Sequence, residues 1–331
     1  MKRILNSINA PLLNSIETLL PQENPNSMIR TKTIVLFFII AAISNHLHAQ
    51  DLMDMLKDET PKTNYTYATF KTTRIVLGQS VESPASGTLQ FLVEHNFGAI
   101  NSGAYNMWGL DVSTVRLGLE YGINDWLSVG IGRSSYEKTF DGSVKAKILR
   151  QSTGARNMPL SMSFYGGAML NSLKWADTSR TNYFSSRMSY VAQLLIARKF
   201  SNAFSLQLTP TYIHKNLVKT RDDHNDQLSL GIGGRLKVTQ RTTINAEYFY
   251  QIPGFINSYE AEAGVTSEYN NCLSLGVDIE TGGHVFQFRL TNAQPMFERA
   301  FITETTGKWT EGDIFLGFTI NRVFTIRKPK S

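Results

Sequence analysis

The chain has 331 residues, of which 42% are hydrophobic and 18% are charged, and its mean hydropathy is −0.19. This composition excludes a disordered chain and a bundle of membrane helices, whereas a membrane β-barrel remains compatible because only its alternate residues contact lipid. The formal charge of +6 includes no basic run, so no nucleic-acid partner is expected.

The stretch "MIRTKTIVLFFIIAAISNHLHAQ" (28–50) has two basic residues, an apolar run and then small residues that end at Ala49. This order is typical of a secretory signal peptide. Its apolar run is about half of the roughly 20 residues that a membrane-spanning helix needs. We therefore expect a signal peptide over 28–49, a true start at Met28 with 1–27 mis-assigned, and export to the bacterial outer membrane.

Residues 50–87 precede the strand-rich region. Within them "YATFKTTRIVLGQSVE" (67–82) has strand-like stretches but no hairpin partner. The segment is an extra edge strand, a periplasmic tether or an insert in the barrel lumen. We favour the lumen, since Lys71 and Arg74 would find acidic partners there.

From Thr88 onward the side chains alternate with a period of two, the signature of β-strands. In 114–122, for example, Val115, Leu117 and Leu119 fall on one face and Arg116 and Glu120 on the other. We expect an all-β fold, a transmembrane antiparallel up-and-down barrel over 88–326 followed by a tail at 327–331. Its twelve predicted strands are 88–97, 112–122, 126–136, 144–151, 159–170, 187–200, 204–214, 227–238, 242–251, 271–280, 284–292 and 312–325.

The lengths of the connections between these strands depend on whether a connection is odd- or even-numbered in chain order. The odd ones have 14, 7, 16, 12, 19 and 19 residues, and the even ones have 3, 7, 3, 3 and 3. Outer-membrane barrels have short periplasmic turns and long extracellular loops. The parity therefore favours a membrane barrel over a soluble sandwich.

Charged side chains gather on one face of the strands, as a cost of roughly 2–4 kcal/mol for a mid-bilayer Lys or Arg would require. The apolar face is therefore predicted to contact lipid, and the charged face to line the lumen. The lumen-lining candidates are Glu94, Arg116, Glu120, Lys145, Lys147, Arg235, Glu247, Asp278 and Arg289. They would pair across strands and fill the interior, which we favour, or create a field that selects solutes.

Three other motifs give weak signals. "TETTGKWTEGD" (303–313) lacks the glycine spacing of a phosphate-binding loop and is expected to fold over the barrel mouth. "RDDHND" (221–226) lacks the ligand spacing of a calcium loop, so a solvated acidic loop is favoured over a weak cation site. The one cysteine, Cys272, is expected to be a small filler. No metal and no cofactor are predicted.

Catalysis is the least favoured class of function. A lipid hydrolase in a barrel wall needs a serine beside a histidine on the outer face. His95 and His284 have outward parity, but no outward serine is evident beside either. The protein is therefore not expected to be an enzyme.

Several stretches resemble an uncharacterised family of membrane-bound β-barrel proteins from Bacteroidota, a domain-of-unknown-function family. They include "ATFKTTRIVLGQSVE" (68–82), "RLGLEYGINDWLSVGIGRSSYEKTFDG" (116–142) and "IETGGHVFQFRLTNAQ" (279–294). The resemblance covers about 51–326. It implies a membrane barrel and carries no assigned catalytic or binding residues.

Function is consequently narrowed to three hypotheses. The first is a narrow channel or transport component for small solutes, surrounded by outer-membrane lipid. The second is a closed structural or docking barrel whose outer loops form its functional surface. The third, less favoured, is a lipid-active enzyme. Protein partners are not predicted.

Overall fold

The computed structural model describes residues 62–175, 177–262 and 265–327. The chain divides into two units, Met1–Thr60 and Pro61–Ser331, and only the second contains described residues. The predicted signal peptide therefore lies outside them.

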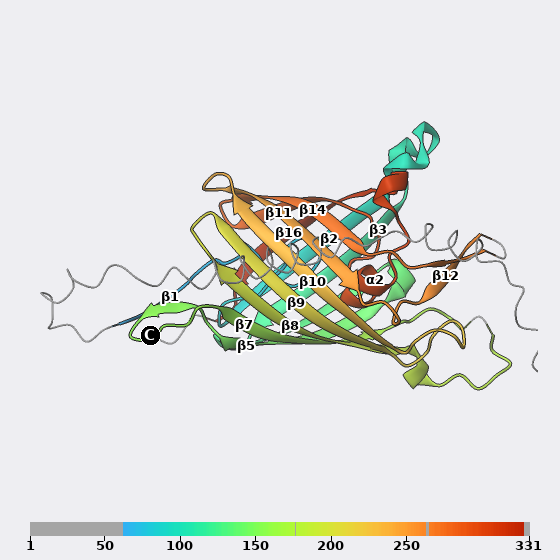
Figure 1. The fold of residues 1–331 in the computed structure, drawn as a ribbon, viewed down its shortest axis with the longest axis horizontal. Helices are drawn as coiled ribbons and strands as arrows, with labels where there is room; N and C mark the ends of the chain where they lie inside the picture. Colours follow the sequence, from blue (N-terminus) through green and yellow to red (C-terminus); the bar gives the residue numbers. More distant parts are fainter. Residues whose placement is uncertain (1–61, 176, 263–264, 328–331) are drawn as a thin grey trace, which may run out of the picture. The chain divides into compact units, whose positions relative to one another are not determined.

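Twelve long strands form a closed antiparallel barrel, in which the last strand pairs with the first (Figure 1). The predicted fold class and number of strands are confirmed. The strands are β2 (Thr88–Ala99), β3 (Ser113–Gly122), β4 (Leu127–Ser134), β5 (Phe140–Leu149), β7 (Ser161–Leu170), β8 (Met188–Lys199), β9 (Phe204–Lys215), β10 (Asp226–Lys237), β11 (Thr242–Gln251), β14 (Cys272–Thr281), β15 (His284–Thr291) and β16 (Phe315–Thr325).

Several short elements are not part of the barrel wall. β1 (Thr63–Tyr65) pairs with β6 (Ser152–Gly154), and β12 (Ser258–Glu262) pairs with β13 (Val265–Glu268). The one α-helix of the described residues is α2 (Glu298–Thr303), and short 3₁₀ turns lie in the loops. No helix in the described part of the chain is long and apolar enough to cross a membrane.

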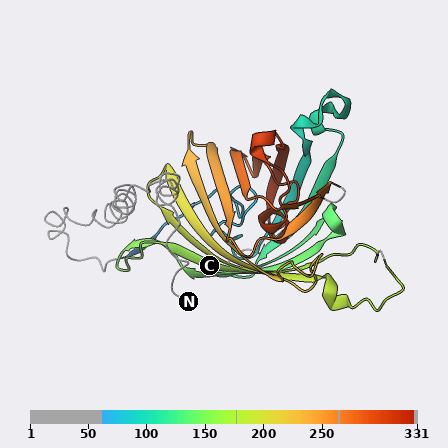
Figure 2. The same cartoon turned by 45° about the vertical axis from the view of Figure 1, so that its right-hand side comes forward.

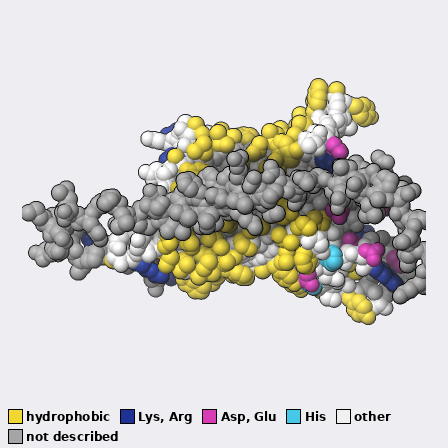
Figure 3. Space-filling view, viewed as in Figure 1, with side chains coloured by type: hydrophobic (Ala, Val, Ile, Leu, Met, Phe, Trp, Pro, Cys, Tyr) yellow, Lys and Arg dark blue, Asp and Glu magenta, His cyan; other side chains and the backbone are white. Residues whose placement is uncertain are grey.

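The two faces of the wall differ as the alternation predicts. Outward side chains such as Ile131, Leu208 and Phe288 are exposed on the barrel, whereas inward Gln90, Gln193 and their counterparts are buried. The visible wall is almost entirely hydrophobic, and charged side chains appear toward its two ends (Figure 3). An apolar outer wall is what a lipid environment selects.

The connections alternate between long and short as predicted, except on the two sides of β5. This strand begins at Phe140 rather than at 144, so the loop before it, 135–139, is shorter than expected, and the connection after it, 150–160, is longer. The Asp141-Gly142 pair suggests a turn in the sequence. In the structure it continues the alternation, with Phe140 outward and Asp141 inward.

The barrel interior is filled. The segment before β2 runs into the space that the strands enclose, and the connection between β15 and β16 folds back to meet it, as both ribbon views indicate (Figure 2). We call Thr69–Glu82 the lumen hairpin and residues 292–314 the mouth loop. Both contribute to one buried apolar cluster, with Leu77 from the hairpin and Phe297 and Phe301 from the loop.

Candidate functional site in the barrel interior

The lumen hairpin is a tight antiparallel turn. Arg74 and Gln79 form its bridge, and the Ile75 N–H donates to the Gly78 carbonyl at 2.8 Å. A Cβ atom at Gly78 would lie 2.8 Å from the Phe249 ring, which is closer than van der Waals contact permits. A glycine is therefore needed where the hairpin meets the wall.

The tip of the hairpin is bound by Glu247, which projects inward from β11. The backbone N–H groups of Val76, Leu77 and Gly78 donate to its carboxylate at 3.2, 2.6 and 3.0 Å. A carboxylate that accepts several backbone N–H bonds makes a strong, charge-assisted contact. Glu247 is buried, so this contact fixes the tip inside the barrel.

The sides of the hairpin bind polar side chains from other strands. The amide group of Gln207 exchanges two hydrogen bonds with the hairpin backbone, at Gln79 and Val81, each of 2.7–2.8 Å. Lys145 Nζ donates to the Ser80 and Glu82 carbonyls at 3.1 and 3.0 Å. The hairpin backbone is therefore held by hydrogen bonds that water could replace, while its apolar side chains pack in the buried apolar cluster.

Arg74 lies at the centre of a charge network. Its Nη1 atom lies 2.6 Å from a Glu298 carboxylate oxygen of α2, and its guanidinium lies 3.8 Å from both Glu94 and Glu120. Gln79 also donates to Glu298, at 2.7 Å. Arg74, Glu94 and Glu298 are all buried, so the network links the hairpin, the wall and the mouth loop.

The wall carries a second part of this network. Arg116 pairs with Glu94 and forms a bidentate contact with Asp141, at 2.5 and 3.0 Å. A planar guanidinium suits such a bidentate contact with a carboxylate. Glu94 therefore bridges Arg74 of the hairpin and Arg116 of the wall.

The other predicted lumen residues lie apart from this network. Arg289 donates to Asn96 and Thr319 at 2.7 and 2.5 Å, and Asp278 accepts from Gln287 at 2.9 Å. Arg235 is buried opposite Asn245, and Lys147 is partly exposed on β5. Of the nine candidates, the structure brings Glu94, Arg116 and Glu120 together around Arg74, while Lys145 and Glu247 bind the hairpin backbone.

The mouth loop is held by a third set of charges. Arg299 pairs with Glu304 at 2.7 Å and also with Glu137, and Lys215 pairs with Glu304 at 2.8 Å. Burial favours the neutral form of Glu304, but the two cations outweigh it and lower its pKa to about 2. Glu304 is therefore ionised at neutral pH and anchors the loop.

Sequence reasoning missed the acidic partners in the mouth loop, and Asp141 was assigned to a connection. The loop carries no periodic pattern, so nothing in the sequence marks Glu298, Arg299 or Glu304 as buried. The available signal for Asp141 is its spacing: it lies two residues before Ser143 and four before Lys145, both of which share its side of β5.

The weak motifs do not assemble into sites. In "RDDHND", Asp223 accepts backbone N–H groups, whereas Asp226 binds Tyr212 and His214, and the described residues hold no cluster of three metal-ligating side chains. In "TETTGKWTEGD", Lys308 pairs with Glu311 at 2.8 Å. Cys272 is buried in the apolar cluster.

The outward histidines have no serine opposite them. The ladder partners of His95 are Val115 and Phe318, and those of His284 are Thr281 and Arg322. His95 stacks on the Phe318 ring with 5.1 Å between centroids. Neither histidine therefore has a serine as its direct ladder partner.

Together the closed wall, its apolar outer face and its charged interior define a membrane-spanning β-barrel. The sequence model of the family described as "Membrane bound beta barrel domain (DUF5777)" matches residues 70–324. The chain belongs to this family, which confirms the resemblance to an uncharacterised family of membrane-bound β-barrels. No curated protein sequence matches the chain.

Solved structures of porins and channels are similar to it at low identity. The NanC porin is 7% identical, with a TM-score of 0.43 over 72% of this chain and 98% of that one. The KdgM porin is 10% identical, with a TM-score of 0.41 over 72% and 99%. An outer membrane channel from Pseudomonas putida F1 is 12% identical, with a TM-score of 0.43 over 73% and 97%.

Proposed function

We propose that the protein is a narrow channel for small solutes in the bacterial outer membrane, and that the described structure is its closed state. The observation that carries this proposal is the polar contact between the lumen hairpin and the wall. Glu247, Lys145 and Gln207 all bind the hairpin's backbone rather than apolar side chains. When the hairpin leaves, these groups are already suited to line a hydrated path.

The charge network supports the same proposal. Burying ions costs several kcal/mol each and is repaid only by good pairing, so well-packed apolar residues often fill an interior at least as stably. Arg74 joins three carboxylates that belong to three separate parts of the chain. Such a network suits a contact that must form and break, with water hydrating the charges in the open state.

Export and lipid contact belong to this proposal as well. The signal peptide predicted over 28–49 would direct the chain across the inner membrane. The apolar outer wall would then contact outer-membrane lipid. We propose no enzymatic role.

A second candidate is a closed barrel that acts as a docking element. The filled interior favours it, because the described hairpin and mouth loop pack their apolar side chains into one buried cluster. In that case the outer loops would be the working surface and the hairpin would be a permanent core.

Solute efflux from proteoliposomes distinguishes the two candidates. The refolded chain from Gln50 is compared with a chain that begins at Gly87 and so lacks the hairpin. A channel predicts faster efflux of a small sugar from the shortened chain, with retention of a large dextran. Equal, background efflux from both correctly folded chains would contradict the channel and favour the docking barrel.

A further inference from the structure

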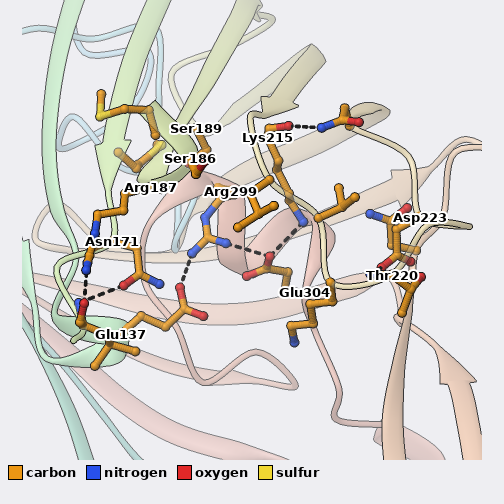
Figure 4. Close-up of a pocket in the computed structure, with 18 of the residues that line it drawn as sticks. Glu137, Asn171, Ser186, Arg187, Ser189, Lys215, Thr220, Asp223, Arg299 and Glu304 are labelled. Atoms are coloured by element: carbon orange, nitrogen blue, oxygen red, sulfur yellow. Dashed lines mark hydrogen bonds and ion pairs between the residues drawn. The ribbon is translucent and has the colours of Figure 1, made fainter. Parts of the chain in front are cut away.

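A cavity of about 920 Å³ lies at the mouth of the barrel. Its lining comes from the loops that follow β4, β7, β9, β11 and β15, and from the adjoining strand ends. Figure 4 shows several of its side chains projecting toward one space, with the Arg299–Glu304 contact between them. Its volume falls within the usual range for sites that bind small molecules.

The cavity carries an excess of positive charge. Seven Lys and Arg residues line it, against three acidic residues, which leaves an excess of four. The whole chain, by comparison, has 33 basic and 27 acidic residues. The excess is therefore concentrated here, and a concave site lined by one sign of charge focuses its field on the opposite sign.

The acidic groups are already occupied. Glu137 and Glu304 are paired with Arg299. The Asp223 carboxylate accepts the backbone N–H of Thr220 at 3.0 Å and that of Ser258 at 3.3 Å. The low pKa of Glu304, about 2, keeps its pairing intact at neutral pH. Glu137 and Glu304 are therefore balanced by their cationic partners, and the excess of four positive charges in the lining still favours an entering anion.

The cations nearer the solvent are available to a ligand. Lys174, Arg180 and Arg221 are exposed on the outer loops. Arg187 is held in place, because its guanidinium lies 4.0 Å from the Trp175 ring centroid and donates to the Asn171 carbonyl at 2.9 Å. A fixed guanidinium binds a carboxylate at a lower entropic cost than a mobile lysine does.

The remaining lining suits hydroxyl groups. Ser186, Ser189 and Asn225 provide neutral hydrogen-bonding groups, and Leu173 and Leu217 provide exposed apolar surface. A ligand that uses all these features carries a negative charge, several hydroxyl groups and a compact carbon skeleton.

We infer that this cavity, which we call the vestibule, binds a polyhydroxylated organic anion and concentrates it before transport. The inference rests on the proposed channel function for its biological purpose, but the binding itself does not require an open pore. Recognition combines the exposed cations Lys174, Arg180 and Arg221, which we call the rim, with the oriented Arg187 and the neutral hydrogen-bonding groups.

Binding to the closed protein tests this inference. The refolded chain from Gln50 is titrated in detergent with lactobionate, and separately with lactitol, which has the same disaccharide skeleton but an alcohol in place of the carboxylate. Because each exposed charge pair contributes modestly, we expect lactobionate to bind about tenfold more tightly than lactitol, with the difference shrinking as salt rises. Equal binding of the two, or no binding of either, would overturn the inference.

A matched pair of variants locates the site. In the rim variant, Lys174→Gln, Arg180→Gln and Arg221→Gln are combined, and lactobionate binding should weaken roughly tenfold. The control combines Lys237→Gln, Arg241→Gln and Arg322→Gln, which removes as many exposed cations from the short-turn end. Equal weakening by both variants would mean that net charge alone attracts the anion, which contradicts a vestibule site.

The two proposals fail separately. A barrel that binds lactobionate through the rim but allows no efflux from either chain would contradict the channel function and support the vestibule as a binding site. A barrel that conducts but binds lactobionate and lactitol equally would support the channel function and overturn the inference of an anion site in the vestibule.

Discussion

Arg74 and Glu298 form a buried ion pair of 2.6 Å, although 224 positions separate them in the sequence. One lies in the lumen hairpin and the other in the mouth loop, so the pair joins the two segments that fill the barrel. Neither segment belongs to the wall. The contact between them can therefore break without loss of the strand ladder.

The first prediction concerns the stability of this contact. Arg74→Gln leaves Glu298 and Glu94 without their shared cation in a buried setting, which costs about 3–5 kcal/mol in comparable cases. We expect chemical unfolding in detergent to show a loss of that order, or a selective loss of hairpin protection if the barrel stays folded. Limited proteolysis at the hairpin distinguishes these two results.

Lys71→Gln is the matched control in the same hairpin. Lys71 is mostly buried, but it pairs with Glu280, whose side chain is 56% exposed, and a pair that is open to solvent on one side contributes far less than a fully buried one, on the order of 1 kcal/mol. An effect of Lys71→Gln as large as that of Arg74→Gln would contradict a special role for the buried pair.

The second prediction concerns the tip of the hairpin. Glu247→Gln weakens the charge-assisted contacts to the Val76, Leu77 and Gly78 amides, each worth roughly 1.5–3 kcal/mol. We expect hydrogen exchange of a peptide that covers 75–78 to accelerate on the order of ten- to hundredfold.

Asp278→Asn provides the control on the neighbouring strand. Asp278 is also buried, but it contacts Gln287 and Thr243 rather than the hairpin. Its substitution should leave exchange over 75–78 unchanged. Acceleration by both variants would indicate general loosening of the wall.

The third prediction concerns pH. The folded-state pKa of Glu304, about 2, lies below its ordinary value of 4.5 because Arg299 and Lys215 stabilise the carboxylate against the opposing effect of burial. A depressed pKa contributes stability that is fully present above the unfolded-state value and is lost as pH falls through the folded-state value. The mouth loop should therefore stay anchored down to about pH 4.5 and loosen between there and about pH 2.

Hydrogen exchange over 298–305, corrected for intrinsic rates, measures this transition. The Glu304→Gln variant should exchange faster at neutral pH and lose the acid transition. Loosening of the wild-type loop that begins near neutral pH would contradict the assignment to Glu304.

The fourth prediction concerns orientation. The mouth loop and the vestibule lie at the long-loop end of the barrel, which the outer-membrane arrangement places outside the cell. A membrane-impermeant maleimide should label Arg221→Cys on intact cells but not Gln240→Cys in the short turn 238–241. The native Cys272 is buried and should not be labelled. Labelling in the reverse pattern would invert the proposed topology.

Most of the wall could be predicted from the sequence, because alternation has a simple physical cause. Residues such as Leu230 and Ile232 face outward and Gln207 and Glu247 face inward, as lipid on one side and polar contacts on the other require. The predicted start of β5 was wrong, because the Asp141-Gly142 pair is typical of a turn. In the structure Asp141 points into the barrel and pairs with Arg116.

The interior was harder to predict because its contacts are non-local. Lys71 and Arg74 were expected to meet acidic partners, but no local pattern identifies Glu280 and Glu298 as those partners. Similarly, α2 has only six residues, too few for a helical period to be visible. Its position follows from tertiary packing of Phe297 and Phe301 rather than from helix propensity.

Single-channel recording in a planar bilayer tests the central claim most directly. The refolded chain from Gln50 is compared with the chain that begins at Gly87, which lacks the lumen hairpin. We predict that the full chain is mostly silent with rare openings, and that the shortened chain gives stable, larger conductance steps. Equal silence from both correctly folded chains would contradict a channel closed by the hairpin.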